Sequence, residues 1–299
     1  EKKKNIFGDK LAALMQMHIT YEDGKEEVVV TDNGWKASTG PILMSEIYHG
    51  EIYDARLEKE GWSTNAFDDS EWRGVKVLDK PKNILVAQVN EPVRKIEEIK
   101  PVAIITTPSG ETVLDMGQNM VGWLRFAVEG EAGTVVTIKH AEVLDKEGNF
   151  YTKNLRSARQ TIQFILKGQG REVFEPHFTF QGFRYVKVEG YPGELSLDNF
   201  TGVVIHSDME RTGSFKCSDE LVNQLQHNIL WGQKGNFVDV PTDCPQRDER
   251  LGWTGDAQVF IRTACFNMNT ALFFTKWLKD LKADQLDNGG VPYVIPHVL

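Results

Sequence analysis

The amino-acid sequence predicts a multidomain chain in which antiparallel β-sandwich domains come first and a helical region follows. Three observations support this fold class. The length of 299 residues exceeds the size at which one hydrophobic core usually stops growing. Stretches of alternating or β-branched residues recur up to about position 205, as in VGWLRFAV (121–128) and FRYVKVEG (183–190). After His206 the apolar residues recur at every third or fourth position, which is the period of amphipathic helices.

The strand-rich part divides into two sections. Alternating residues are punctuated by turn-forming groups such as DKEGN and YPGE, a pattern typical of antiparallel strands with one buried face. The segment EPVRKIEEIKP (91–101) interrupts this pattern with charge and proline. We therefore expect domains at 1–96, 97–210 and 211–299.

Three amphipathic segments follow in the helical region. In SDELVNQLQHNILWGQK (218–234), Ser218 is a candidate N-cap residue. One apolar stripe of this segment consists of Leu221, Val222, Leu225 and Ile229. The other two segments are DAQVFIRTACF (256–266) and TALFFTKWLKDLKADQ (270–285). A chain of this pattern is expected to begin a helical domain near residue 211.

Composition excludes several functional classes. The net charge of −9 disfavours nucleic acid as a partner, because binding to phosphates needs clustered lysine and arginine. No apolar stretch approaches the ~18 residues that a membrane span requires, so no membrane partner is expected. The three cysteines have no metal-site spacing, and neither a cofactor nor a metal is expected. We expect a soluble protein; a cytoplasmic, periplasmic or secreted location and a homo-oligomer all remain open.

The segment DVPTDCPQRDERLGWTGD (239–256) concentrates the chemistry. If a helix begins near Arg247, then Glu249, Trp253 and Asp256 fall within about 60° of one another on its surface. Carboxylates accept hydrogen bonds from sugar hydroxyls, and an indole stacks on the C–H face of a pyranose. One of the acids would hold a raised pKa through burial and neighbouring carboxylates, as a general acid needs.

Glycines and competing explanations bear on the same segment. Gly252 and Gly255 would each need a reason to interrupt a helix, such as a close approach of backbone. Spacing alone favours a capping and salt-bridge network at a helix start, which is the more frequent use of such clusters. Calcium binding by Asp239, Asp243 and Asp248 is a further alternative, although their order lacks the alternation of a known calcium loop.

Matches along the whole chain lead to a family. The string PTDCPQRDERLGWTGDAQ (241–258) resembles the signature of the bacterial α-L-rhamnosidases of glycoside hydrolase family 78. GPILMSEIYHGEIYDARLEKEGW (40–62) and DDSEW (68–72) resemble the family's N-terminal β-domain. The remaining matches resemble its concanavalin-like β-sandwich and the entry to its catalytic (α/α)6 barrel: LDMGQNMVGWLRF (114–126), HAEVL (140–144), FEPHFTFQGFRYVKVEGYPG (174–193) and GSFKCSDELVNQL (213–225).

The resemblance assigns roles to four residues. Glu249 matches the general acid, which protonates the glycosidic oxygen. Asp243 and Asp256 match carboxylates that bind the rhamnose hydroxyls, and Trp253 matches an aromatic residue of the sugar pocket. The implied function is α-L-rhamnosidase activity, an inverting hydrolysis of terminal α-L-rhamnose on a glycan or glycoside, carried out by a six-hairpin glycosidase.

Asp248 competes with Glu249 for the role of the acid. Some family members carry a shorter RER form of the motif, so alignment from the left selects Asp248. The spacing to the downstream tryptophan and aspartate selects Glu249, which we follow. Asp248 and Arg247, which offsets part of the acidic charge, are further candidates for the site.

The resemblance also implies that this chain is a fragment. An inverting enzyme needs a second carboxylate opposite the acid, which in the family is a glutamate of a later helix pair, beyond this chain. A barrel of twelve helices needs far more than the 89 residues from 211 to 299. We therefore expect this chain alone to be inactive. The alternatives are a non-catalytic carbohydrate-binding β-sandwich protein, whose rhamnose affinity would survive deletion of 211–299, and a purely structural fragment.

Overall fold

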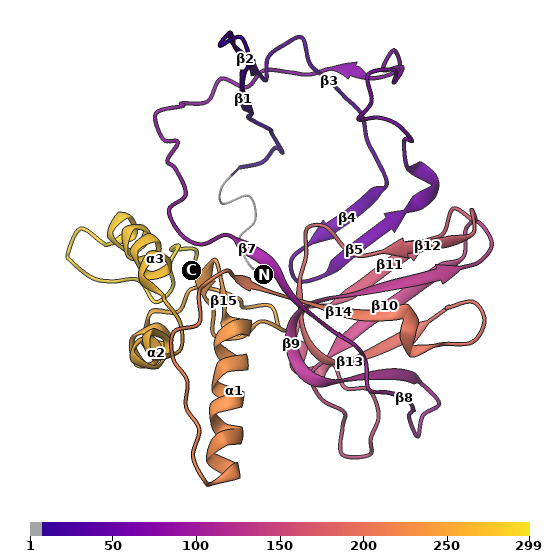
Figure 1. Ribbon diagram of the computed structural model, residues 1–299, viewed down its shortest axis with the longest axis vertical. Coiled ribbons are helices and arrows are strands. Elements are labelled where there is room, and N and C mark those ends of the chain that lie inside the picture. The colour runs from indigo at the N-terminus through magenta and orange to yellow at the C-terminus, as the bar shows by residue number, and fades with distance from the viewer. Residues whose placement is uncertain (1–7) are drawn as a thin grey trace. The chain divides into compact units, whose positions relative to one another are not determined.

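The computed structural model describes residues 8–299 (Figure 1). The chain forms two compact units. The smaller unit consists mainly of Glu1–Gly40 and Leu57–Ala87, and the larger one mainly of Pro41–Arg56 and Gln88–His297.

Two short strand pairs build the smaller unit. Strands β1 (Gln16–Thr20) and β2 (Glu26–Val30) form an antiparallel hairpin. Its turn contains Gly24 at a φ of 80°, a conformation that glycine adopts without strain. The second pair joins β3 (Lys36–Ala37) to β6 (Arg73–Gly74).

A sheet of ten strands dominates the larger unit. Eight of them follow the order β4-β5-β11-β10-β13-β9-β14-β7, while β8 and β12 pair with β9 as well. The strands are β4 (Ile42–Glu46), β5 (Gly50–Asp54), β7 (Val93–Ile99), β8 (Ala103–Thr106), β9 (Thr112–Glu129), β10 (Val135–Ala141), β11 (Thr161–Ile165), β12 (Arg171–Phe174), β13 (Gln181–Glu189) and β14 (Phe200–Ser207). Three 3₁₀ turns accompany them: η1 (Ala55–Leu57), η2 (Lys153–Leu155) and η3 (Leu197–Asn199).

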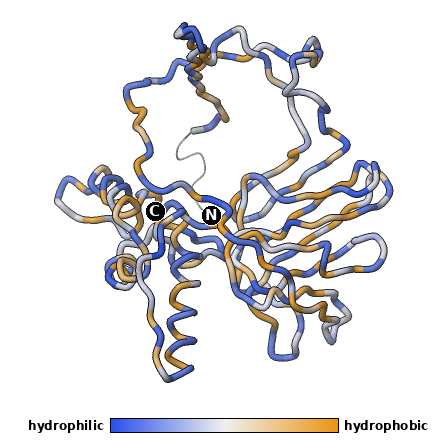
Figure 2. Tube along the Cα trace, viewed as in Figure 1, coloured by the Kyte–Doolittle hydropathy of each residue, from blue (hydrophilic) through white to orange (hydrophobic). Residues whose placement is uncertain are grey.

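Strand β9 curls the sheet. Its first residues pair with β8 and β13, and its last residues pair with β12 and β14, so one long strand serves both ends of the sheet. The curled sheet encloses a core of side chains such as Leu114, Phe126, Ile138, Phe183 and Phe200. Apolar and polar stretches both occur along its strands, drawn orange and blue in Figure 2.

The second face of β9 is also buried. Val121 and Trp123 point away from the main core and form a separate cluster with Val203 and Ile205. Helix α1 (Glu220–Asn236) packs on β9 and β14 there (Figure 1). The alternation predicted one buried face, and the tertiary structure covers both because the helical region lies on the outer one.

Strand β5 joins the sheet in an unexpected direction. It pairs parallel to β11, with Gly50 opposite Thr161, whereas the sequence predicted antiparallel strands throughout. A Cβ atom at position 50 would lie 2.0 Å from the carbonyl oxygen of Thr161, so only glycine permits this approach. Strands β4 and β5 thereby bring part of the segment expected in the first domain, 1–96, into the large sheet.

Three helices follow the sheet, as predicted. They are α1 (Glu220–Asn236), α2 (Thr254–Asn267) and α3 (Ala271–Asp284). The N-cap residue of α1 is Asp219, whose carboxylate accepts from the backbone N–H of Leu221 at 2.9 Å, and not Ser218. A hairpin of β15 (Phe237–Val238) and β16 (Val240–Pro241) separates α1 from α2. This order, sheets first and helices after, confirms the predicted fold class.

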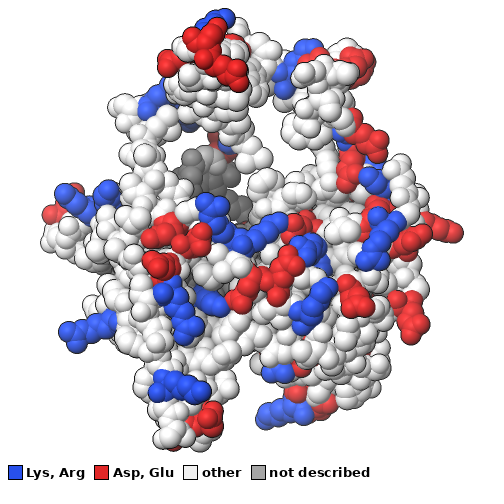
Figure 3. All heavy atoms as spheres, in the orientation of Figure 1, with Lys and Arg blue, Asp and Glu red and all other residues white. Residues whose placement is uncertain are grey.

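Helices α2 and α3 share a second hydrophobic core. Phe237 stacks on Phe273 with ring centroids 4.6 Å apart, and Phe274, Trp277 and Ile295 enclose the pair. On the face drawn in Figure 3, acidic and basic side chains lie interspersed. Among the described residues, no helix has the length and apolarity needed to cross a membrane.

Candidate active site

The acidic cluster lies on a loop, residues 242–253, that connects β16 to α2; we name it the acid loop. An antiparallel bridge between Thr242 and Gly252 joins its two ends. The backbone N–H of Thr242 also donates to the carbonyl oxygen of Asn236 at 2.8 Å. The ends of the loop are therefore fixed together, and residues distant within it can meet.

The acid loop is not helical. Helix α2 begins only after Trp253, its N-cap residue. The predicted helix start near Arg247 is therefore wrong, and so is the single helix face that would carry Glu249, Trp253 and Asp256. These three residues instead occupy the loop, the N-cap and the first turn of the helix.

Arg250 explains why the loop departs from helix. Its φ of 48° lies in the left-handed region, which a right-handed helix does not include. Its side chain is only 6% exposed, and Nη1 donates to the carbonyl oxygens of Ile47 and Phe180, both at 2.6 Å. Burial lowers the pKa of this guanidinium to about 10, so it remains charged at neutral pH. A buried charge needs such partners, and the loop adopts the conformation that reaches them.

Gly252 makes the close backbone contact that the sequence predicted. A Cβ atom there would lie 2.2 Å from the carbonyl oxygen of Ile295 and 2.9 Å from Nε1 of Trp277. Gly255 makes no such contact, because a Cβ atom at that position meets open space. The prediction is thus right for Gly252 and wrong for Gly255, which lies in the first turn of α2.

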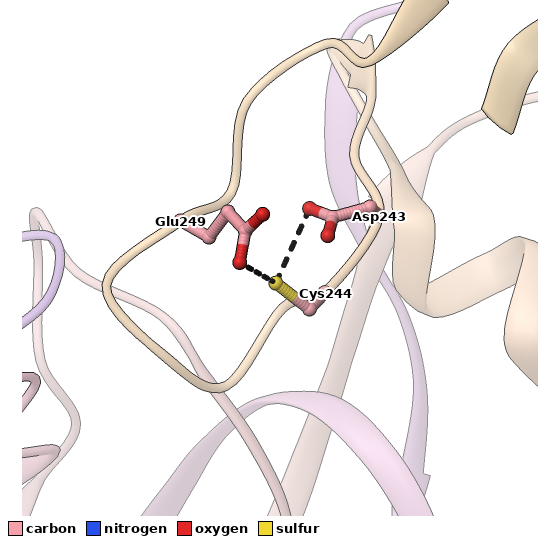
Figure 4. Close-up of side chains that lie close together, drawn as sticks. All are labelled: Asp243, Cys244 and Glu249. Carbon is pink, nitrogen blue, oxygen red and sulfur yellow. Dashed lines mark hydrogen bonds between the residues drawn. The ribbon is translucent and has the colours of Figure 1, made fainter. Parts of the chain in front are cut away.

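Three side chains of the acid loop converge. Figure 4 shows the carboxylates of Asp243 and Glu249 facing each other, with the thiol of Cys244 between them. The Cys244 thiol lies 3.2 Å from Oδ1 of Asp243 and 3.4 Å from Oε2 of Glu249. Burial, with the neighbouring acids, raises the pKa of Cys244 to about 12. The residue is therefore a thiol that donates its single proton to one carboxylate at a time.

Arginines bind the same carboxylates. Nε of Arg247 lies 2.7 Å from Oε2 of Glu249, and its Nη2 lies 3.5 Å from Oδ2 of Asp243. Arg156, from the loop before β11, places Nη2 2.7 Å from Oε2 of Glu249 and Nε 2.7 Å from Oδ1 of Asp248. Ser157 also donates to Asp248. The loop can hold several carboxylates close together because guanidinium groups lie between them and offset their negative charge.

The two facing acids hold protons differently. Burial, together with the negative charge of Glu249, raises the pKa of Asp243 above its usual range. Burial acts in the same direction on Glu249, but hydrogen bonds from Arg247 and Cys244 lower its pKa below the usual value. The raised pKa expected for one acid of this cluster thus belongs to Asp243. Any proton that the pair shares resides on Asp243 in this arrangement.

The cluster is poorly suited to a metal ion. Ligand atoms of Asp243, Cys244 and Glu249 do lie within 4.8 Å of one another. However, a metal needs a thiolate, and two guanidinium groups already bind Glu249. The acids proposed as calcium ligands bind different cationic side chains. Asp239 pairs with Lys276 at 3.2 Å, while Asp248 pairs with Arg156.

A cavity of about 550 Å³ opens between α1, α2 and the acid loop. Asp243 and Asp256 both line it, together with apolar side chains such as Ile229 and Phe260. Glu249 does not belong to its lining. Asp243 therefore has two roles in the geometry. It lines the cavity together with Asp256, and it forms the carboxylate pair with Glu249.

Trp253 lies half-buried at the start of α2. Among residues 8–299, its indole N–H has no hydrogen-bond acceptor. A backbone bridge to Val294 fixes its main chain. The indole nitrogen is itself buried, and Trp253 is not among the residues that line the cavity.

Sequence reasoning missed three contributors to this site. Cys244 lies inside the quoted motif and could have been noticed as a potential donor. Arg156 and Ser157 lie 93 and 91 residues before their acidic partners, and no local pattern marks them. Only the folded sheet brings their loop to the acid loop.

Three models of protein families match consecutive parts of the chain. Residues 1–97 match the α-L-rhamnosidase N-terminal domain. Residues 105–206 match the bacterial α-L-rhamnosidase concanavalin-like domain. Residues 210–299 match the bacterial α-L-rhamnosidase six-hairpin glycosidase domain.

Curated proteins and solved structures agree with these matches. An α-L-rhamnosidase of Streptomyces avermitilis is 48% identical over 98% of this chain, and one of Formosa agariphila is 43% identical over 96%. The chain spans 28% and 31% of the lengths of these relatives.

Among solved structures, a native α-L-rhamnosidase from Aspergillus terreus has a TM-score of 0.97 and 48% identity, over 99% of this chain and 35% of that one. The Streptomyces avermitilis enzyme complexed with L-rhamnose has a TM-score of 0.92 and 47% identity, over 96% and 28%.

Proposed function

The chain belongs to the α-L-rhamnosidases of glycoside hydrolase family 78, and we propose that it forms part of an enzyme that hydrolyses terminal non-reducing α-L-rhamnose from rhamnosides with inversion. The observation that carries this proposal is the acid loop, which joins a carboxylate pair to a cavity through Asp243. The relatives named above are α-L-rhamnosidases, and one was solved with L-rhamnose.

Glu249 is the proposed general acid. It protonates the glycosidic oxygen while the bond to the rhamnose carbon breaks. Both acids bind Arg156, but Glu249 also shares the Cys244 thiol with Asp243, whereas Asp248 accepts from Ser157, and this favours Glu249. Glu249 is thus the acid next to the residue that lines the cavity.

Sugar binding is assigned to two carboxylates that line the cavity and to two other residues of the acid loop. Asp243 and Asp256 accept hydrogen bonds from rhamnose hydroxyls, since carboxylates are strong acceptors. Trp253, the N-cap residue of α2, offers its half-buried ring for stacking on the sugar. Arg247 donates to the sugar from beside Glu249.

Glu249 must gain a proton before it can act. Arg247 and Arg156 favour its carboxylate form, so a proton shared by the two acids resides on the neighbouring Asp243. A rhamnose hydroxyl gives Arg247 another acceptor, which weakens its hold on Glu249 and raises the proton affinity there. Asp243 then passes its proton to Glu249, and Glu249 passes it to the leaving oxygen.

The reaction needs a base on the opposite side of the sugar. That base removes a proton from water as the water attacks the anomeric carbon, at ~6.5–9.5 Å from the acid. We assign this role to a glutamate on a later helix of the six-hairpin domain, outside this chain.

Substitution of Glu249 tests the proposal. In the full-length enzyme that contains this chain, Glu249→Gln is expected to lower kcat/KM for an alkyl rhamnoside by about 10²–10⁴-fold. The loss should be much smaller for an aryl rhamnoside whose leaving group needs no proton. Steady-state kinetics on both substrates measure this difference.

Asp248→Asn provides the comparison. Its loss of activity is expected to be the same for both leaving groups, because it removes a partner of Arg156 and Ser157 and not the proton donor. If Asp248→Asn discriminates between the substrates and Glu249→Gln does not, then Asp248 is the acid and our assignment is wrong.

A further inference from the structure

One arginine of the β-rich part of the chain binds both Asp248 and Glu249. Arg156 binds Asp248 through Nε and Glu249 through Nη2, at 2.7 Å each. Two neighbouring carboxylates therefore share a single guanidinium. This arginine belongs to the matched concanavalin-like segment 105–206, whereas both acids belong to the helical segment 210–299.

The loop that carries Arg156 is fixed at several points. Leu155 and Ala158 are buried, and they hold the segment between η2 and β11 against the sheet. Gln160 is fully buried, and its side-chain oxygen accepts from the backbone N–H of Gly182 at 3.1 Å. Arg156 itself has a φ of 56°, so the backbone turns sharply there and directs the side chain away from these anchors.

The acid loop is held from the same side. Arg250 donates to the carbonyl oxygens of Ile47 and Phe180, and the Tyr48 hydroxyl donates to the backbone oxygen of Glu249 at 2.8 Å. Both the guanidinium of Arg156 and the backbone of Glu249 are thus placed by one framework. A guanidinium on such a framework can fix the direction of a carboxylate, because its donors have a rigid planar geometry.

We propose that Arg156 is a positioning residue for the general acid, which orients Glu249 and sets the pH range over which this carboxyl group is protonated. The inference rests on the proposed role of Glu249. It makes the concanavalin-like domain a contributor to the catalytic centre, through a residue that touches the acid and not the substrate.

Other charged groups also act on Glu249. Its own loop supplies four of them: Asp243, Cys244, Arg247 and Asp248. The sheet supplies Glu142, whose charge faces Arg247, while Glu46 and the buried Arg250 lie around Tyr48. All of these remain when Arg156 is replaced, so a single substitution isolates its contribution.

Replacement of Arg156 should leave the fold intact. Its side chain is 51% exposed, and exposed ion pairs add little to stability. The expected effect is therefore on the protonation and direction of Glu249. Removal of a positive group at hydrogen-bond distance favours the protonated acid, so the alkaline limb of the pH profile should move upward.

The experiment measures kcat/KM against pH for an alkyl rhamnoside, in the full-length enzyme that contains this chain. Arg156→Met is expected to raise the pH of the alkaline limb by about 0.5–1 unit and to lower kcat about 5–20-fold, with KM nearly unchanged. Arg156→Lys keeps the positive charge but not the planar geometry. It should therefore restore the pH of the alkaline limb and only part of kcat. An unchanged alkaline limb in Arg156→Met overturns the inference.

Two controls separate this inference from the proposed function. Arg159→Met removes an exposed arginine of the same loop and should leave the pH profile as in the parent. The Glu249→Gln background tests whether Arg156 acts through Glu249: Arg156→Met should cause no further shift of the limb there. A shift that persists in this background refutes the inference, whereas full activity of Glu249→Gln alone refutes the proposed function.

Discussion

His140 is a titratable side chain fully enclosed by the sheet. It lies at the end of β10, edge-on to Phe183, with Nδ1 3.0 Å from the carbonyl oxygen of Gln160. Burial lowers its pKa to about 4. The folded state therefore binds this proton less readily than the unfolded chain, in which histidine titrates near its ordinary value of about 6.5.

This burial predicts a pH dependence of stability. The contribution of neutral His140 is present above pH ~6.5 and is lost as the pH falls toward 4, by up to about 3 kcal/mol. His140→Gln should be less stable at pH 7 but lose this part of the acid sensitivity. Thermal unfolding between pH 7 and 4 measures it. The exposed control His227→Gln should keep the parent's slope, and an equal slope in His140→Gln would contradict the assignment.

Arg250 and Cys244 show what a sequence can indicate about single residues. Both lie inside the quoted motif, so their neighbourhood was predictable. Their conformations were not, because the left-handed backbone of Arg250 follows from carbonyl groups of Ile47 and Phe180, which are distant in sequence. Residue identity was therefore informative, whereas the backbone conformation depended on tertiary partners.

At the scale of elements, replacing a glycine by alanine is expected to affect stability differently in the acid loop and at the start of α2. Gly252→Ala would place a Cβ atom 2.2 Å from the carbonyl oxygen of Ile295. The loop must then move, with an expected destabilisation of about 1–3 kcal/mol and a loss of activity in the full-length enzyme. Differential scanning calorimetry and kinetics measure both effects.

Gly255→Ala is the matched variant. A Cβ atom there meets open space in the first turn of α2, so the substitution should stabilise the protein by up to about 1 kcal/mol. If both alanine variants destabilise equally, the contact between Gly252 and Ile295 does not hold the loop.

The element boundaries were predicted with uneven success. The segments expected to be helical correspond to α1, α2 and α3, because apolar residues at a period near 3.6 are a local signal. The extension of α2 back to Arg247 was wrong, since nothing local distinguishes an acid-rich loop from a first helical turn. The sequence predicted antiparallel strands, whereas β5 pairs parallel to β11. This direction depends on a partner strand over 100 residues away.

At the scale of the whole molecule, the chain presents apolar helix faces to solvent. Leu221 and Leu225 of the predicted α1 stripe are 82% and 56% exposed, and Val259 of α2 is 81% exposed. Only the end of α1 near Gln233 is buried. Such faces resemble those that pack on neighbouring helices in larger helical domains.

The polypeptide of 299 residues is expected to show no turnover of an aryl α-L-rhamnoside by itself. It carries the proposed acid and the proposed sugar-binding residues, but inverting hydrolysis also needs a base on the opposite side of the substrate. A chromogenic assay at high enzyme concentration, with the full-length enzyme as reference, measures this. Turnover lost on Glu249→Gln would place a working base within this chain.

The sequence by itself determined the order of the domains, the period of each helix and most strands, and the motif that carries the acids. These are local properties, written in neighbouring residues. The tertiary structure alone decided that Arg156 binds Glu249 and that the acid loop around Arg250 is not helical. It also decided that Asp243 both lines the cavity and forms the carboxylate pair with Glu249. The physical reason is distance along the chain: these contacts join segments up to about 200 residues apart, and only packing of the helices on the curled sheet brings them together.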